Sequence, residues 1–167
     1  MAAGEAVGIL ADASQLQDGS LSRSFVKPVE IEKTPLPRFP DFDWGVTQGD
    51  TLREAEEMAA DAIRTMIREL IRQGKVVPRP SKPRGRKHRM IRLAALDAAK
   101  AELYVAFHAS GLRKAEPARR LGIPKTTVDR LFDLDNHSRL DQMEAAFAVL
   151  GKRLSIEVED AVYPPAA

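Results

Sequence analysis

The 167-residue sequence contains no cysteine and only three histidines, and these absences narrow the chemistry that it can perform. Without cysteine there can be no disulfide and no thiolate metal site. The histidines, His88, His108 and His137, lie too far apart to supply the usual ligand spacing of a zinc site. The sequence therefore predicts no metal, no other cofactor and no catalytic residue.

Long hydrophobic runs are absent as well. No apolar stretch approaches the roughly 20 residues that span a bilayer, so no membrane association is expected. The opening MAAGEAVGIL lacks the basic start of a secretory signal, and we expect a cytoplasmic protein. With 44% hydrophobic and 30% charged residues, the composition is that of a globular chain whose length suits two small domains.

Positive charge is concentrated in one short stretch. Residues 75–92 contain eight basic side chains and no acidic one, whereas residues 1–74 contain eight basic and thirteen acidic side chains, a net charge of −5. Such a basic run attracts polyanions through counterion release, although a solvated tether has the same composition. Because residues 78–92 also hold three prolines, they are predicted to form a basic linker between domains.

The N-terminal half begins with residues 1–24, which show no sustained hydrophobic period and are predicted to be a disordered extension. The first domain is predicted over residues 25–77. Near its start Val29 and Ile31 alternate with glutamates, which predicts a short strand. Pro28 would confine that strand to an edge of a sheet, because proline lacks the N–H that an inner strand needs.

A long helix is predicted in the second part of this domain. Thr51 and Glu54 form a capping box, the signature of a helix start. Apolar residues then recur every three or four positions over residues 52–71, which indicates one buried helical face. Gly74 is expected to end the helix in a left-handed conformation, and residues 76–77, two valines, are a candidate short strand.

The strongest motif is RKAEPARRLGIPKTTVDRLFD at residues 113–133, which predicts two short helices separated by a glycine turn. Ala118 stands where only a small side chain fits between the helices, and Gly122 permits the sharp turn. Pro124 suits the start of the second helix. At the exposed N-terminal end of that helix, side chains can reach base edges and free amides can hold a phosphate. The DNA-binding candidates there are Lys125, Thr126, Thr127 and Arg130. The alternative is a helical bundle that binds no ligand, since glycine-linked amphipathic helices of this size also occur in such bundles.

Flanking helices complete the predicted unit. Apolar spacing over residues 96–107 predicts a preceding helix that stops at Gly111, and a capping box of Ser138 with Asp141 predicts the start of a supporting helix. Asn136 and Ser138 lie in the loop beside the recognition helix. They can contact the DNA backbone or serve only as turn and capping residues.

The helix-turn-helix domain is predicted over residues 93–161, with a short tail at residues 162–167. Near its end, residues 152–160 alternate apolar and polar side chains, which predicts a strand with one apolar face. Pairing with the same strand of a second copy would bury that face and build a two-fold dimer, although folding back onto its own domain is the alternative. The predicted dimerisation residues are Leu154, Ile156 and Val158.

The order of these motifs resembles HicB antitoxins of the type that ends in a Cro/repressor-like helix-turn-helix. The resemblance covers about residues 39–161 and rests on FPDF at 39–42, TQGDTLREA at 47–55, VVPRPS at 76–81, SRLDQ at 138–142 and LGKRL at 150–154. It implies a partner, a HicA-type mRNA-cleaving toxin, and a C-terminal domain that represses its own operon. It also implies an N-terminal domain similar to a degraded ribonuclease H-like unit, with Phe39, Asp41 and Phe42 as toxin-binding residues. The segment before residue 39 departs from the family pattern, so the sheet is expected to be incomplete.

We therefore predict an α+β fold with a small N-terminal α/β domain, a basic linker and a C-terminal all-α helix-turn-helix domain that carries a terminal strand. The predicted function is that of a non-enzymatic antitoxin that binds its toxin and represses its operon as a homodimer or higher oligomer. A stand-alone helix-turn-helix regulator without a functional toxin-binding domain is the alternative. An active nuclease would require a magnesium site, for which the nearest carboxylates are Asp41, Asp43 and Asp50.

Overall fold

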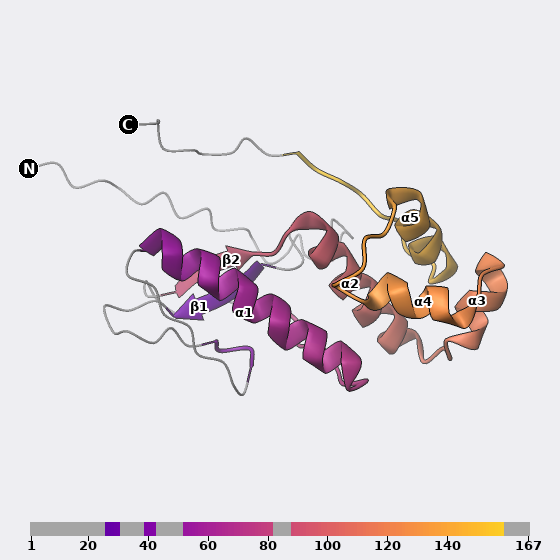
Figure 1. Cartoon of the computed structure of the whole chain (residues 1–167), viewed down its shortest axis with the longest axis horizontal. Coiled ribbons are helices and arrows are strands. Elements are labelled where there is room, and N and C mark those ends of the chain that lie inside the picture. The colour runs from indigo at the N-terminus through magenta and orange to yellow at the C-terminus, as the bar shows by residue number, and fades with distance from the viewer. Residues whose placement is uncertain (1–25, 31–38, 43–51, 82–87, 159–167) are drawn as a thin grey trace, which may run out of the picture.

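The computed structural model describes residues 26–30, 39–42, 52–81 and 88–158. In chain order its elements are β1 (Val26–Glu30), α1 (Leu52–Arg72), β2 (His88–Arg92), α2 (Ala95–Ser110), α3 (Ala115–Leu121), α4 (Lys125–Phe132) and α5 (Leu140–Val149). The arrangement is elongated: β1, β2 and α1 lie at one end, α3, α4 and α5 lie at the other, and α2 connects them (Figure 1).

A small sheet combined with helices is compatible with the predicted α+β class. The predicted N-terminal extension, residues 1–24, and the tail, residues 162–167, lie outside the described residues. Within the described part of the chain, none of the helices combines the length and apolarity needed to cross a lipid bilayer.

The strand predicted around Val29 is confirmed as β1, which pairs with β2 in antiparallel fashion. Pro28 faces Met90 across the pair. Proline is tolerated there because each strand of a two-stranded sheet has an open edge on which no ladder N–H is required. Ile91 of β2 is only 5% exposed and joins the same core as Ile63 of α1, so the sheet is held against that helix.

The predicted linker requires a correction. Residues 88–92, assigned to it because of their basic composition, form β2. Residues 76–77 were predicted to be strand but belong to neither strand of the described sheet: Val77 is buried in the core, whereas Val76 is exposed. Strand formation depends on a partner, and the partner of β2 is β1, which lies before α1 in the sequence.

The long amphipathic helix is confirmed as α1, and it ends as predicted at Gly74, where φ is 67°. The amide of Lys75 donates to the carbonyl of Leu70 at 2.9 Å, and the amide of Gly74 donates to that of Ile71 at 3.0 Å. This pair of bonds is a Schellman motif, which satisfies the last carbonyls of a helix. The predicted capping box at Thr51 lies outside the described residues. The most deeply buried residues of α1 are Ala59, Ile63, Met66 and Ile67.

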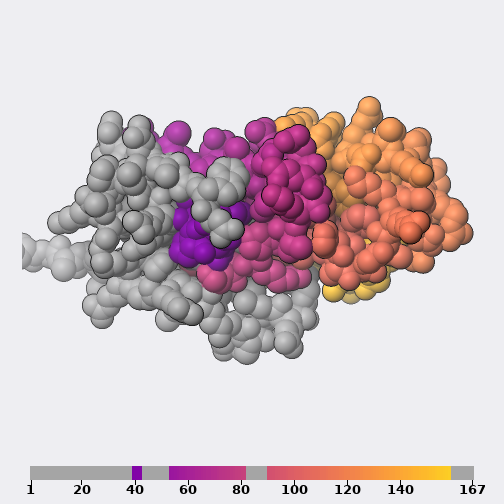
Figure 2. Space-filling view, turned by 90° about the horizontal axis from the view of Figure 1, so that it is seen from below, coloured from indigo at the N-terminus to yellow at the C-terminus, as the bar shows by residue number. Residues whose placement is uncertain are grey.

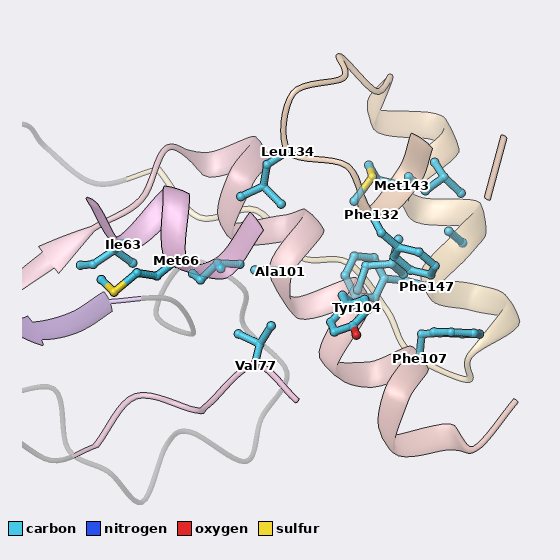
Figure 3. Close-up of a cluster of buried hydrophobic side chains, with 14 of the residues drawn as sticks. Ile63, Met66, Val77, Ala101, Tyr104, Phe107, Phe132, Leu134, Met143 and Phe147 are labelled. Atoms are coloured by element: carbon cyan, nitrogen blue, oxygen red, sulfur yellow. The ribbon is translucent and has the colours of Figure 1, made fainter. Parts of the chain in front are cut away.

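One hydrophobic core runs through both ends of the molecule. Figure 3 shows Ile63 and Met66 of α1 at one end of it and Phe132, Met143 and Phe147 at the other. Between them lies α2, whose Tyr104 ring meets that of Phe132 edge-on with centroids 5.7 Å apart. In the space-filling view, α1 and the C-terminal helices form one continuous body (Figure 2). The two predicted domains therefore contact each other directly through α2.

The C-terminal segment differs from its prediction. Residues 152–158 form neither helix nor strand, so the predicted terminal strand is not present in the described chain. Leu154 is half-buried against the core, whereas Ile156 is 63% and Val158 is 92% exposed. A lone strand leaves its backbone N–H and C=O groups unpaired, and among the described residues no strand lies beside this segment to pair with it.

Candidate nucleic-acid interface

Helices α3 and α4 are the two short helices expected of the predicted helix-turn-helix. Between them Gly122 has φ of 65°, a left-handed conformation that favours glycine. The amide of Ile123 donates to the carbonyl of Ala118 at 3.0 Å and closes the turn. Ala118 is 6% exposed, which agrees with its predicted place between the two helices. The preceding helix, α2, also ends as predicted, at Gly111 with φ of 66°.

The fourth helix has one buried and one exposed side. Val128, Leu131 and Phe132 are buried in the hydrophobic core, and α4 packs against α2 and α3. The predicted DNA-binding residues lie on the opposite side: Lys125, Thr126 and Arg130 are exposed, and Thr127 is half-buried. The four candidates are therefore brought together at an accessible helix face. Their contact with DNA stays a prediction.

The start of α4 is defined by Pro124, which is the N-cap and so stands directly before the first helical residue. Its carbonyl accepts the amide of Thr127 at 2.9 Å and that of Val128 at 3.3 Å. The first amides of a helix have no acceptor within that helix. At α4 these are the amides of Lys125 and Thr126, which are the donors expected to meet a phosphate oxygen.

The charges of this region favour an anionic ligand. Asp129 is the only acidic residue of α4, and its carboxylate is paired with the ammonium of Lys114, just before α3. Among the described residues, Lys125 and Arg130 have no ion-pair partner. The exposed face of α4 therefore carries two uncompensated positive charges, while its one negative charge is neutralised.

The loop after α4 uses Asn136 as a turn residue. Its amide side chain donates to the carboxylate of Asp133, and its backbone amide donates to the carbonyl of Asp133 at 3.2 Å. The amide of Asp135 donates to the same carboxylate at 3.0 Å. Asn136 and Ser138 are both half-buried. The turn role that the sequence left open for Asn136 is therefore observed, and a DNA contact for either residue stays a prediction.

The predicted capping box of Ser138 with Asp141 is wrong. The N-cap of α5 is Arg139, whose amide donates to Oε1 of Gln142 at 3.2 Å. Asp141 instead pairs with the Arg139 guanidinium at 2.7 Å. The helix begins one residue later than predicted because this glutamine closes the first turn in place of the aspartate.

Sequence reasoning missed Lys100, which lies beneath α4. Its side chain is fully buried, and Nζ donates to the carbonyl of Arg130 at 2.9 Å and to that of Asp133 at 2.8 Å. Burial lowers the pKa of its ammonium, while Asp133 and Asp97 act in the opposite direction. The helical period was the available signal: Lys100 follows Leu96 by four residues, so it belongs on the buried face of α2.

The three predicted toxin-binding residues all lie within the described residues, and they differ in how deeply they are buried. Phe39 is 4% exposed and belongs to the core. Asp41 and Phe42 are half-buried, and a carboxylate oxygen of Asp41 accepts the amide of Ser81 at 3.1 Å. Asp41 and Phe42 are thus the two that reach the surface. A toxin contact stays a prediction for all three.

Of the three carboxylates considered for a nuclease, only Asp41 lies within the described residues. Asp41 is engaged by the amide of Ser81, while Asp43 and Asp50 lie outside the described residues. Within the part of the chain that the structure describes, no group of three or more histidine, aspartate or glutamate residues could hold a metal ion.

Comparison of the sequence with known protein families gives a match that lies mostly in the N-terminal half of the chain. Residues 36–102 match the model of the HicB_like antitoxin of bacterial toxin-antitoxin systems. That segment runs from just before Phe39 through α1 and β2 into α2. These residues therefore have the sequence pattern of a bacterial antitoxin.

Curated relatives support the same assignment. Antitoxin HicB of Pseudomonas fluorescens (strain Pf0-1) is 39% identical over 113 residues, which cover 68% of this chain and 77% of the relative. Antitoxin HicB of Escherichia coli (strain K12) is 35% identical over 132 residues, 75% of this chain and 95% of the relative. Antitoxin HicB 1 of Photorhabdus laumondii is 34% identical over 155 residues, 87% of this chain and 98% of the relative. The chain belongs to the HicB antitoxin family.

The match to Antitoxin HicB 1 of Photorhabdus laumondii extends over the candidate interface. Because it covers 87% of this chain, it must extend through α3 and α4 whichever end of the chain is left out. A HicB antitoxin thus aligns with α3 and α4 as well as with the N-terminal segment.

Proposed function

We propose that the protein is an antitoxin that binds and neutralises a HicA-type mRNA-cleaving toxin and represses its own operon by binding operator DNA as a dimer. The observation that carries this proposal is the exposed, positively charged face of α4 in a helix-turn-helix of a HicB family member. Neither role requires catalytic chemistry, and both place the protein in the cytoplasm.

DNA recognition is assigned to the exposed residues of α4. The guanidinium of Arg130 suits the O6 and N7 acceptors of guanine, and the hydroxyls of Thr126 and Thr127 suit base edges or phosphates. Lys125, at the start of the helix, is placed to attract the phosphate backbone of the DNA. Pairing of Asp129 with Lys114 supports the assignment, because it removes the one charge on α4 that would repel a phosphate.

Toxin binding is assigned to the N-terminal unit, which we propose is a reduced ribonuclease H-like α/β unit. The described part of that unit, β1, α1 and β2, supports the proposal by its combination of a sheet with one covering helix. Residues 1–74 carry a net charge of −5, from eight basic and thirteen acidic residues, which complements the basic surface expected of a protein that grips RNA. Asp41 and Phe42 are the proposed surface contacts.

Dimerisation is assigned to the segment that holds Ile156 and Val158. Both side chains are exposed in the single chain, and a second copy of the segment would bury them. A two-fold dimer presents two copies of α4 to the half-sites of a palindromic operator.

Two experiments test the two roles separately. The full chain should protect a palindrome upstream of its own gene from nuclease digestion, and an excess of scrambled duplex should not displace it. The chain should also co-purify with the small ribonuclease encoded by a neighbouring gene and restore growth of cells that express that ribonuclease. Protection without co-purification would support the stand-alone regulator instead, and loss of protection would refute the repressor role.

A further inference from the structure

Lys100 is a charged residue in the centre of the protein, and its contacts are concentrated on α4. Its relative exposure is 0%, and its ammonium donates to two backbone carbonyls, 2.9 Å from that of Arg130 and 2.8 Å from that of Asp133. Both carbonyls lie at the C-terminal end of α4, where the last carbonyls of a helix lack intrahelical partners. Lys100 therefore acts as a C-terminal cap that comes from a different helix.

Stability alone does not account for a lysine at this position. Burial of an ammonium is costly, and replacement of buried charges by apolar side chains of similar volume is often neutral or stabilising. The neighbouring positions on the buried face of α2, such as Leu103 and Tyr104, are occupied by large hydrophobic or aromatic residues. What a lysine adds here, and an apolar side chain cannot, is a pair of directed hydrogen bonds to α4.

Directed bonds matter for α4 because this helix is short. Its eight residues are too few to be stable alone, so its orientation depends on contacts with the rest of the protein. The apolar contacts of Val128, Leu131 and Phe132 are not directional and permit rotation or sliding of the helix. Two hydrogen bonds to its last turn fix both its rotation and its position along its own axis.

We propose that Lys100 is a positioning residue for operator recognition: it holds the last turn of α4, and with it the Arg130 side chain, in the register that reads the base pairs. This inference rests on the proposed DNA-binding function. Lys100 is fully buried and cannot itself touch a phosphate. Its effect is therefore confined to sequence-specific binding, which depends on geometry, and does not extend to non-specific binding, which depends on surface charge.

The test compares Lys100→Met with Lys125→Met in the full-length protein. Methionine keeps a flexible, unbranched side chain, one atom shorter than that of lysine, and has no N–H donor. Affinities for an operator duplex and for a scrambled duplex of equal length are measured at one salt concentration. For Lys100→Met we expect operator affinity to fall about tenfold while affinity for scrambled DNA stays within about twofold of wild type. For Lys125→Met, which removes an exposed charge, both affinities should fall.

A second readout does not involve DNA. In Lys100→Met the amide resonances of the last turn of α4 should shift while those of α3 stay in place, and the melting temperature should stay within about 5 °C of the wild type. Lys100→Gln, which keeps two N–H donors on a shorter side chain, should recover part of the operator affinity.

Three results would overturn the inference. One is an operator affinity unchanged in Lys100→Met. Another is an equal loss of operator and scrambled binding. The third is loss of folding in both Lys100→Met and Lys100→Gln, which would assign the lysine to stability. If the wild-type chain itself binds no operator, the proposed function fails and the inference falls with it. If the wild type binds and Lys100→Met binds equally well, only the inference fails.

Discussion

Arg64 of α1 and Asp97 of α2 form an ion pair across the middle of the molecule, with Nε and Oδ2 3.0 Å apart and side-chain exposures of 28% and 14%. The same guanidinium donates through Nη2 to the carbonyl of Leu134 at 2.7 Å and lies 3.0 Å from a carboxylate oxygen of Asp135. A single side chain therefore joins α1 to α2 and to the residues that directly follow α4.

Loss of this junction should destabilise the protein. We expect Arg64→Met to lower the free energy of unfolding by about 2 kcal/mol, because it leaves the Asp97 carboxylate and the Leu134 carbonyl without their donor. Arg68, one turn further along α1, pairs with Asp135 at an exposed position, so Arg68→Met should cost less than about 1 kcal/mol. Urea unfolding of both variants measures the difference. Equal effects would contradict the role of Arg64.

The carboxyl of Asp135 should titrate below its ordinary range. The hydrogen bond from Arg64 is the main cause that lowers the pKa of Asp135, and Arg68 adds to it. A carboxyl whose pKa is lower in the folded state stabilises that state above its unfolded pKa and loses this contribution as the pH falls through its folded pKa. NMR titration should place this pKa below that of an unfolded aspartate, and Arg64→Met should move it back up. A value unaffected by the substitution would argue against the contact.

The packing of α5 into the hydrophobic core should depend on one buried methionine. Met143 is 1% exposed, so we expect Met143→Ala to cost about 2–5 kcal/mol of unfolding free energy through lost burial and a residual cavity. Leu140, one turn earlier, is 52% exposed, and Leu140→Ala should cost less than about 1 kcal/mol. Thermal unfolding of the two variants gives the comparison. A destabilising effect of Leu140→Ala as large as that of Met143→Ala would contradict this packing.

Self-association should depend on the exposed C-terminal segment. We expect the wild type to sediment as the proposed dimer and the double variant Ile156→Ser/Val158→Ser to shift toward monomers in sedimentation velocity, because the double variant lacks the apolar side chains that a second copy would bury. Leu140→Ser is the matched control, since Leu140 is also an exposed apolar residue but lies outside the segment. A double variant that remains dimeric would exclude this segment as the interface.

The sequence predicted those parts of the fold that depend on local signals. The helical period of residues 52–71, the glycines that end helices and the small Ala118 all act over a few residues, and α1, α3 and α4 appear where they were expected. The candidate DNA-binding residues followed from the same signals. They lie together on α4 because a helix fixes the relative positions of neighbouring side chains.

The parts that could not be predicted depend on contacts distant in sequence. Residues 88–92 have the composition of a linker and form a strand only because β1 pairs with them. Lys100 has a side chain that normally favours water, and its burial depends on the hydrogen bonds that its ammonium donates to the carbonyls of Arg130 and Asp133. The alternating pattern at residues 152–158 predicted a strand, but alternation does not supply the neighbouring strand that the segment needs.

The most direct test of α4 as the recognition helix is the affinity of the protein for operator DNA when α4 is altered. Fluorescence anisotropy should be measured with an operator duplex for the wild type and for Lys125→Ala/Thr127→Ala. The control is Arg53→Ala, which removes one positive charge from the first turn of α1, at the end of that helix away from α4 (Figure 1). We expect the double variant to bind at least about 30-fold more weakly, while the control binds like the wild type. Undiminished operator binding by the double variant would contradict α4 as the recognition helix.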